Sequence, residues 1–270
     1  MLKEYEYLTE TKDNEGEAFE RLRTIVGILR QKCPWDKVQT HESLRTCMLE
    51  EAYETIEAID NKDVPNLREE LGDVMLQVIF HGMLAEEDDA FSLTDVINEE
   101  CEKMIRRHPH VFLEESAKSI DKALEKWENM KSDEHVNQTC TDRLEDVPKA
   151  LPALMRSCKV QSRASKFGFD WDNIEDVFSK VQEEYGELRT SYDQSDEQGI
   201  EEELGDLLFS VVNLSRFLKV DPEESLTKST NKFIQRFDKM EKMSAEKEIS
   251  LIDMSLEQMN ELWEEAKKSK

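Results

Sequence analysis

The chain has 270 residues, of which 36% are charged and 38% hydrophobic, and its formal net charge at pH 7 is -26. This length is enough for two modest domains with separate cores. So strong a negative charge would repel a phosphate polymer, which excludes a nucleic-acid duplex as a partner. Only 8 Gly and 6 Pro are present, too few for the many tight turns of an all-β fold.

The N-terminal stretch, MLKEYEYLTETKDNEGE, is acidic and lacks the apolar run of a signal peptide. The longest apolar run, 74–80, contains Gln77 and is far too short to span a bilayer. The five cysteines are widely spaced and form no CxxC pair, which indicates neither a disulfide framework nor a zinc ribbon. We therefore expect a cytoplasmic protein with reduced thiols and no membrane partner.

Two helices are predicted in the first half of the chain. Apolar residues recur at helical spacing along residues 44–59 and again along residues 67–79. Between them, Asp63 and Pro65 form a typical helix start. Because the connection has only a few residues, the two helices should be antiparallel neighbours in a bundle.

The second half of the chain repeats this helix pair. Glu51 aligns with Glu184 and Asp73 with Asp206, both at an offset of 133 residues and without a gap between them. Two tandem copies of one helical unit explain the match. We predict an N-terminal domain at residues 1–130, a polar linker at 131–150 and a C-terminal domain at 151–270.

Each copy carries the pattern EExxE followed by ExxD. Residues three apart share a helix face, and Glu51 falls inside the apolar stripe of its helix. A buried carboxylate without a partner is costly, and a divalent cation removes that cost. The predicted ligands are Glu51, Glu54, Glu70 and Asp73, and in the second copy Glu184, Glu187, Glu203 and Asp206.

Oxygen ligands alone favour Mg²⁺, with Mn²⁺ as the other candidate. Zinc is disfavoured because no His or Cys joins the cluster, and di-iron because Glu-x-x-His pairs are absent. In so acidic a chain, a single EExxE is typical of a solvated helix face. Its duplication within an apolar stripe favours the metal site.

The EExxE…ExxD pattern resembles the signature of the all-α nucleoside triphosphate pyrophosphohydrolases. CPWDKVQTHESL (33–44), RRHPHVF (106–112) and LPALMRSCKVQSRASKFGFDW (151–171) extend the resemblance to tandem-domain MazG proteins along most of the chain. The resemblance implies an all-α fold of two tandem MazG-like helical bundle domains, in an interlaced homodimer. It also implies magnesium-dependent hydrolysis of nucleoside triphosphates to monophosphate and diphosphate, broad for ribo- and deoxyribonucleotides.

The same resemblance places the main catalytic unit in the second half, where Glu184, Glu187, Glu203 and Asp206 would be catalytic. It assigns nucleotide contacts to Lys180, Lys232, Arg236 and Trp263. The alternative is that these four residues have no part in binding: the basic side chains would be exposed on helix surfaces, and Trp263 would belong to the core. Three other functions stay open: a nucleotide- or metal-binding regulatory protein without turnover, a scaffold with acidic surfaces, and a relative specific for dUTP, a modified nucleotide or phosphoribosyl-ATP.

Overall fold

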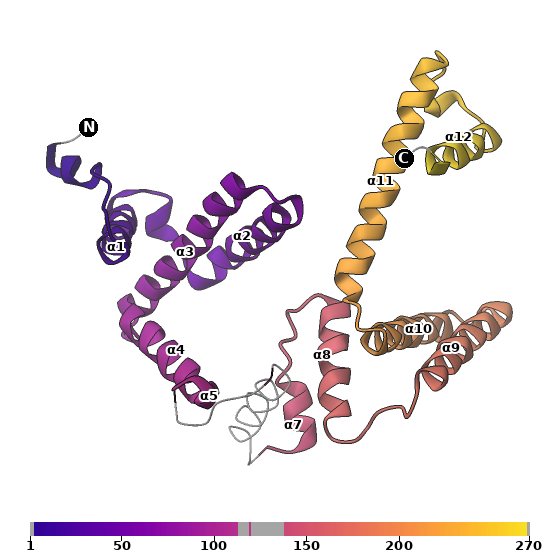
Figure 1. Ribbon diagram of the computed structural model, residues 1–270, viewed down its shortest axis with the longest axis horizontal. Coiled ribbons are helices and arrows are strands. Elements are labelled where there is room, and N and C mark those ends of the chain that lie inside the picture. The colour runs from indigo at the N-terminus through magenta and orange to yellow at the C-terminus, as the bar shows by residue number, and fades with distance from the viewer. Residues whose placement is uncertain (1–2, 113–118, 120–137, 269–270) are drawn as a thin grey trace. The chain divides into compact units, whose positions relative to one another are not determined.

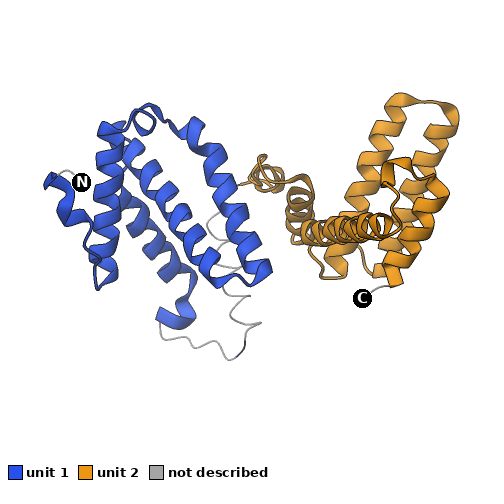
Figure 2. Ribbon diagram, turned by 90° about the horizontal axis from the view of Figure 1, so that it is seen from above, with its two compact units in different colours: residues 1–134 blue, residues 135–270 orange. Residues whose placement is uncertain are grey.

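The structure is a computed structural model that describes residues 3–112, 119 and 138–268. Every regular element in this described part is helical (Figure 1). The chain divides into two compact units, Met1–Glu134 and His135–Lys270 (Figure 2). None of the described helices is both long enough and apolar enough to cross a membrane. The expected all-α class is therefore confirmed.

Unit 1 holds a helix hairpin flanked by further helices. Its described elements are η1 (Lys3–Leu8), α1 (Glu15–Lys32), η2 (Asp36–Val38), α2 (His41–Asn61), α3 (Val64–Glu87), α4 (Leu93–Arg107) and α5 (Pro109–Phe112). Helices α2 and α3 form the hairpin, and α1 and α4 pack against α3. The core is a cluster of buried apolar side chains: Val26, Leu44, Ile79, Phe80, Leu84 and Leu93.

Unit 2 repeats the hairpin. Its described elements are α7 (Cys140–Glu145), α8 (Ala153–Ser165), α9 (Ile174–Gln194), α10 (Glu197–Phe217), α11 (Pro222–Glu246), η3 (Leu251–Asp253) and α12 (Leu256–Lys268). Helices α9 and α10 form the hairpin, with α8 against α10 and α12 against α11. Within the predicted linker, residues 131–137 lie outside the described residues, and α7 packs on α8.

The two hairpins turn in the same way. Lys62 and Ser195 end the first helix of each hairpin in the left-handed conformation, both with φ of 56°. The next residue, Asp63 or Asp196, returns its N–H to the helix and caps the following helix with its carboxylate. This arrangement is a Schellman motif followed directly by an N-cap. The identical turn explains why the repeat runs without a gap through both helices.

Candidate metal and nucleotide site

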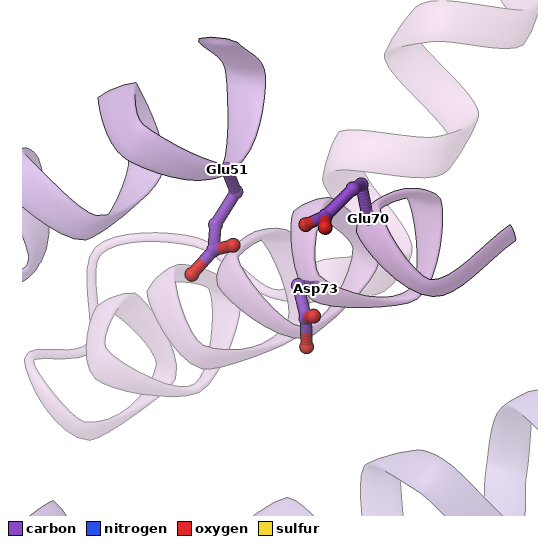
Figure 3. A group of neighbouring side chains, drawn as sticks. All are labelled: Glu51, Glu70 and Asp73. Carbon is purple, nitrogen blue, oxygen red and sulfur yellow. The ribbon is translucent and has the colours of Figure 1, made fainter. Parts of the chain in front are cut away.

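The carboxylates of unit 1 converge between the two helices of its hairpin. Glu51 projects from α2 towards Glu70 and Asp73 on α3 (Figure 3). One oxygen of each of these three residues lies within 4.8 Å of the others. Burial is the main cause of a raised pKa at Glu51, and repulsion from Asp73 is the next. Burial is the main cause of a raised pKa at Glu70, and repulsion from Glu54 is the next. Glu51, Glu70 and Asp73 therefore form one cluster, whereas Glu54 lies beside Glu70 and is exposed.

The carboxylates of unit 2 converge in the same way. Oxygens of Glu184 and Glu187 from α9 and of Glu203 from α10 lie within 4.8 Å of one another. Burial first, then repulsion from Glu187, Glu184 and Asp206, raises the pKa of Glu203. Three hard oxygen donors at this spacing fit the needs of Mg²⁺ or Mn²⁺.

Lys180 gives the unit 2 cluster a positive charge of its own. One turn before Glu184 on α9, its Nζ lies 2.7 Å from Glu184 and 2.8 Å from Glu183. Hydrogen bonds to Glu183 and then to Glu184 raise the pKa of Lys180. At the equivalent position of unit 1 the sequence has Cys47, which carries no ammonium group. The two clusters thus differ in charge although their acids are the same.

A cavity of about 480 Å³ opens beside the unit 2 cluster. Glu184, Asp206 and Lys180 belong to its wall, so the cluster and the cavity are continuous. Three aromatic residues also belong to the wall: Phe169, Trp171 and Phe209. This volume lies in the range of small-molecule sites, and flat aromatic groups next to charged ones suit a ligand that is part ring and part anion.

At the position of one cavity-wall residue, unit 1 has a core side chain instead. Asn213 lines the cavity of unit 2, and its equivalent at the offset of 133 residues is Phe80. Phe80 is only 4% exposed and packs within the unit 1 core cluster. The same replacement of polar by apolar side chains occurs at Arg216, whose equivalent is Met83. The units therefore keep the same acids but differ in what lies beside them.

Of the predicted nucleotide contacts, only Lys180 is at this site. Lys232 and Arg236 lie on α11, and Trp263 lies on α12. Trp263 packs on the small core between α11 and α12, with its ring 5.1 Å from that of Phe233 and 5.8 Å from the Arg236 guanidinium. None of these three residues is in the described wall of the cavity.

The structure adds site residues that the sequence did not single out. Gln161 on α8 lines the cavity, and in the sequence it lies within the family-like stretch 151–171. Arg216 on α10 pairs with Asp170, with an Nη1–Oδ2 distance of 2.9 Å. This pair ties the segment before α9 to α10. No periodicity marks these residues, since they come from three segments that only packing brings together.

Fold and clusters together define an all-helical protein with a duplicated carboxylate site suited to hard divalent cations. The MazG nucleotide pyrophosphohydrolase domain matches residues 39–112 and again residues 173–240. The nucleoside triphosphate pyrophosphohydrolase/pyrophosphatase MazG of Thermotoga maritima is 45% identical over 254 residues, which cover 93% of this chain and 96% of that protein. A nucleoside triphosphate pyrophosphohydrolase of Escherichia coli K12 is 40% identical, with 92% and 97% covered.

Among solved structures, the crystal structure of a mazG-related protein from Thermotoga maritima is 33% identical, with a TM-score of 0.38. It covers 42% of this chain and 98% of that chain. The sequence matches show that the chain belongs to the MazG nucleotide pyrophosphohydrolase family. They confirm the family, the two tandem helical domains and the enzyme class expected from the sequence, a hydrolase of the nucleoside triphosphate pyrophosphohydrolase type.

Proposed function

We propose that the chain is a magnesium-dependent enzyme that converts nucleoside triphosphates to monophosphates and diphosphate, and that it accepts both ribo- and deoxyribonucleotides. Residues 151–270 form the main catalytic domain, and residues 1–130 form a domain of the same fold. The observation that carries this proposal is the continuity of the unit 2 carboxylates with a cavity lined by aromatic side chains. A triphosphate at the carboxylates places its base in that cavity.

The four acids Glu184, Glu187, Glu203 and Asp206 would hold the cation, and unit 1 offers Glu51, Glu54, Glu70 and Asp73 as a second cation site. Bound Mg²⁺ supplies Lewis-acid stabilisation of the phosphate oxygens and makes a water molecule more acidic. Mn²⁺ fits the same oxygen donors.

Lys180 has a separate part in this proposal. In the structure it neutralises Glu184, and its ammonium lies at the border between the carboxylates and the cavity. A triphosphate chain at that border would meet a positive group within the acidic cluster. Lys180 would then bind the phosphates, and Glu184 would be free to serve as a metal ligand.

The test is diphosphate release from a panel of ribo- and deoxyribonucleoside triphosphates with and without Mg²⁺. Glu184→Gln with Glu187→Gln removes two ligands from unit 2, and Glu51→Gln with Glu54→Gln is the matched change in unit 1. We expect metal-dependent turnover that only the unit 2 variant abolishes. Loss in the unit 1 variant alone would reverse the assignment, and no turnover of any triphosphate would contradict the proposed function.

A homodimer is part of the proposal, because unit 2 leaves large apolar side chains exposed. These lie on α9, α10 and α11: Tyr185, Tyr192, Leu204, Leu208, Phe233 and Ile234. A second copy of the chain would cover such surface. Size-exclusion chromatography with light scattering should give a dimer, and a monomer that is unchanged by concentration would contradict it.

The dimer also gives a place to Lys232, Arg236 and Trp263, which do not line the cavity of their own chain. We propose that they contact the nucleotide from the second copy. Trp263→Ala should then raise KM, and added Trp263→Ala chains should impair sites formed with a wild-type partner.

All five cysteines are free thiols. A cytoplasmic location, without nucleic-acid or membrane partners, stays a prediction.

A further inference from the structure

Three adjacent residues of the unit 2 cavity wall come from the connection between α8 and α9. They are Phe169, Asp170 and Trp171, which we call the wall segment. Phe169 is 85% exposed and Trp171 is 40% exposed, so packing against the core does little to fix either ring. Both rings therefore present surface that a ligand in the cavity can cover.

The carboxylate of Asp170 anchors the wall segment to α10. Its Oδ2 accepts a hydrogen bond from Nη1 of Arg216 at 2.9 Å, and its Oδ1 accepts one from Nη2 of the same side chain. Oδ1 also accepts from the backbone N–H of Trp171 at 2.9 Å. One carboxylate thus joins the backbone beside the Trp171 ring to a residue 46 positions further along the chain.

Arg216 is itself held by its own helix. Its Nε and Nη2 donate to Oδ1 of Asn213, at 3.1 Å and 2.9 Å. Together with the two bonds to Asp170, these contacts use all but one of the N–H donors of the guanidinium group. A planar fork that is bound on both sides keeps one orientation. Arg216 is therefore suited to bracing Asp170 rather than to capturing a phosphate.

The same helix carries two of the predicted cation ligands, Glu203 and Asp206. Because Arg216 lies on that helix too, its bonds to Asp170 set the position of the wall segment relative to the cation ligands. A nucleotide with phosphates at the cations and its base on the rings needs these two parts at a fixed separation. The ion pair therefore couples the phosphate end of the site to the aromatic end.

Unit 1 does not have the residues for this brace. The counterpart of Arg216 is Met83, which packs against the unit 1 core. The Trp-Asp pair that begins at Trp171 has its counterpart at Trp35, and the residue before Trp35 is Pro34 instead of an acid. The brace is thus found in the unit whose carboxylates adjoin the cavity.

We propose that Arg216 is a positioning residue, which acts through Asp170 to hold the two rings of the wall segment in place for a nucleobase. The inference rests on the proposed function for the kind of ligand. It adds the residue pair that fixes the aromatic end of the site. The pair should therefore matter for binding of the base and not for binding of the phosphates.

The test measures, by calorimetry with Mg²⁺, the binding of two probes: the α,β-methylene analogue of ATP, and inorganic tripolyphosphate, which has no base. Arg216→Met introduces the residue of unit 1. It should weaken binding of the nucleotide analogue about 5- to 150-fold, the worth of stacking a base, and leave tripolyphosphate binding unchanged. Asp170→Ala should have the same effect, and the double variant should bind no more weakly than either single variant, because the two residues act as one unit.

Arg23→Met is the matched control. Arg23 on α1 pairs with Glu86 on α3, with an Nη2–Oε2 distance of 3.3 Å, and this partly exposed pair also joins two segments of the chain. Arg23→Met removes the same kind of contact from unit 1 and should bind both probes as the wild-type protein does. Thermal unfolding of each variant shows whether its fold is kept.

Weaker binding of both probes by Arg216→Met would overturn the inference, because Arg216 would then be a phosphate ligand. In that case Asp170→Ala would release the guanidinium group and strengthen binding, which is opposite in sign to our expectation. Unchanged binding of the nucleotide analogue in both variants would also overturn it. If Arg216→Met does not fold, Arg216→Lys keeps the charge without the planar fork and must show the same selective loss. Diphosphate release is measured separately, so the proposed function can stand while this inference fails.

Discussion

Asn213→Phe would give unit 2 the residue that fills the equivalent place in unit 1. Asn213 lines the cavity beside the carboxylates, whereas Phe80 is buried in the unit 1 core. A phenyl ring at Asn213 should occupy the space that we assign to the base. It should leave the metal ligands in place, because the change lies nearly two turns beyond Asp206 on α10.

The expected magnitude follows from the contacts that the ring would displace. Stacking of a base on aromatic side chains contributes about 1–3 kcal/mol. Its loss corresponds to a decrease in kcat/KM of about 5- to 150-fold. The ring enters an existing cavity of about 480 Å³, so the stability cost should stay below the roughly 1–3 kcal/mol of overpacking a filled core. Arg216 loses Asn213 as a partner but keeps Asp170.

The assay is steady-state diphosphate release with ATP, together with thermal unfolding followed by circular dichroism. Phe80→Asn is the mirror-image control: removal of the buried ring should cost about 3–5 kcal/mol, as for other Phe truncations, without touching the cavity of unit 2. We expect one variant to lose activity and the other to lose stability. An Asn213→Phe protein that unfolds cooperatively and keeps wild-type kcat/KM would refute the assignment of the cavity to the base.

Three further predictions follow from single contacts. Asp170→Asn should lower the free energy of unfolding modestly, because Arg216 holds the pKa of Asp170 below its ordinary value and this partly exposed pair contributes about 1 kcal/mol or less. That contribution to stability is present above the unfolded-state pKa of Asp170 and is lost as the pH falls through its folded-state pKa. Wild type and variant should therefore become equally stable in acid. Urea unfolding at a series of pH values measures this. Ser195→Gly should stabilise unit 2 by up to about 1.6 kcal/mol, since relief of a left-handed residue gains about 1–2 kcal/mol and the added chain entropy of Gly offsets about 0.4–1 kcal/mol. A lower urea midpoint would contradict this. Mn²⁺ at about 100 times its Kd should stabilise each unit that binds one ion by about 2.7 kcal/mol. Glu184→Gln with Glu187→Gln should remove this gain from unit 2, as measured by calorimetry with and without chelator.

Local sequence was enough to predict the helices, the repeat and the acids. Helical periodicity and i,i+3 spacing act within one or two turns, so Glu70 and Asp73 share a face wherever the helix lies. The repeat at an offset of 133 residues showed that both halves carry the same hairpin. Both hairpins turn through a left-handed residue that is followed by an aspartate cap.

The cavity, in contrast, was decided by tertiary packing. Gln161 and Phe209 are 48 residues apart, and their hydrogen bond exists only because α8 packs on α10. Periodicity marks where apolar residues lie, but it does not show whether the side chains of neighbouring helices fill the space between them. The acids are the same in both halves, and a buried Phe80 in one with a cavity-lining Asn213 in the other makes the two units different.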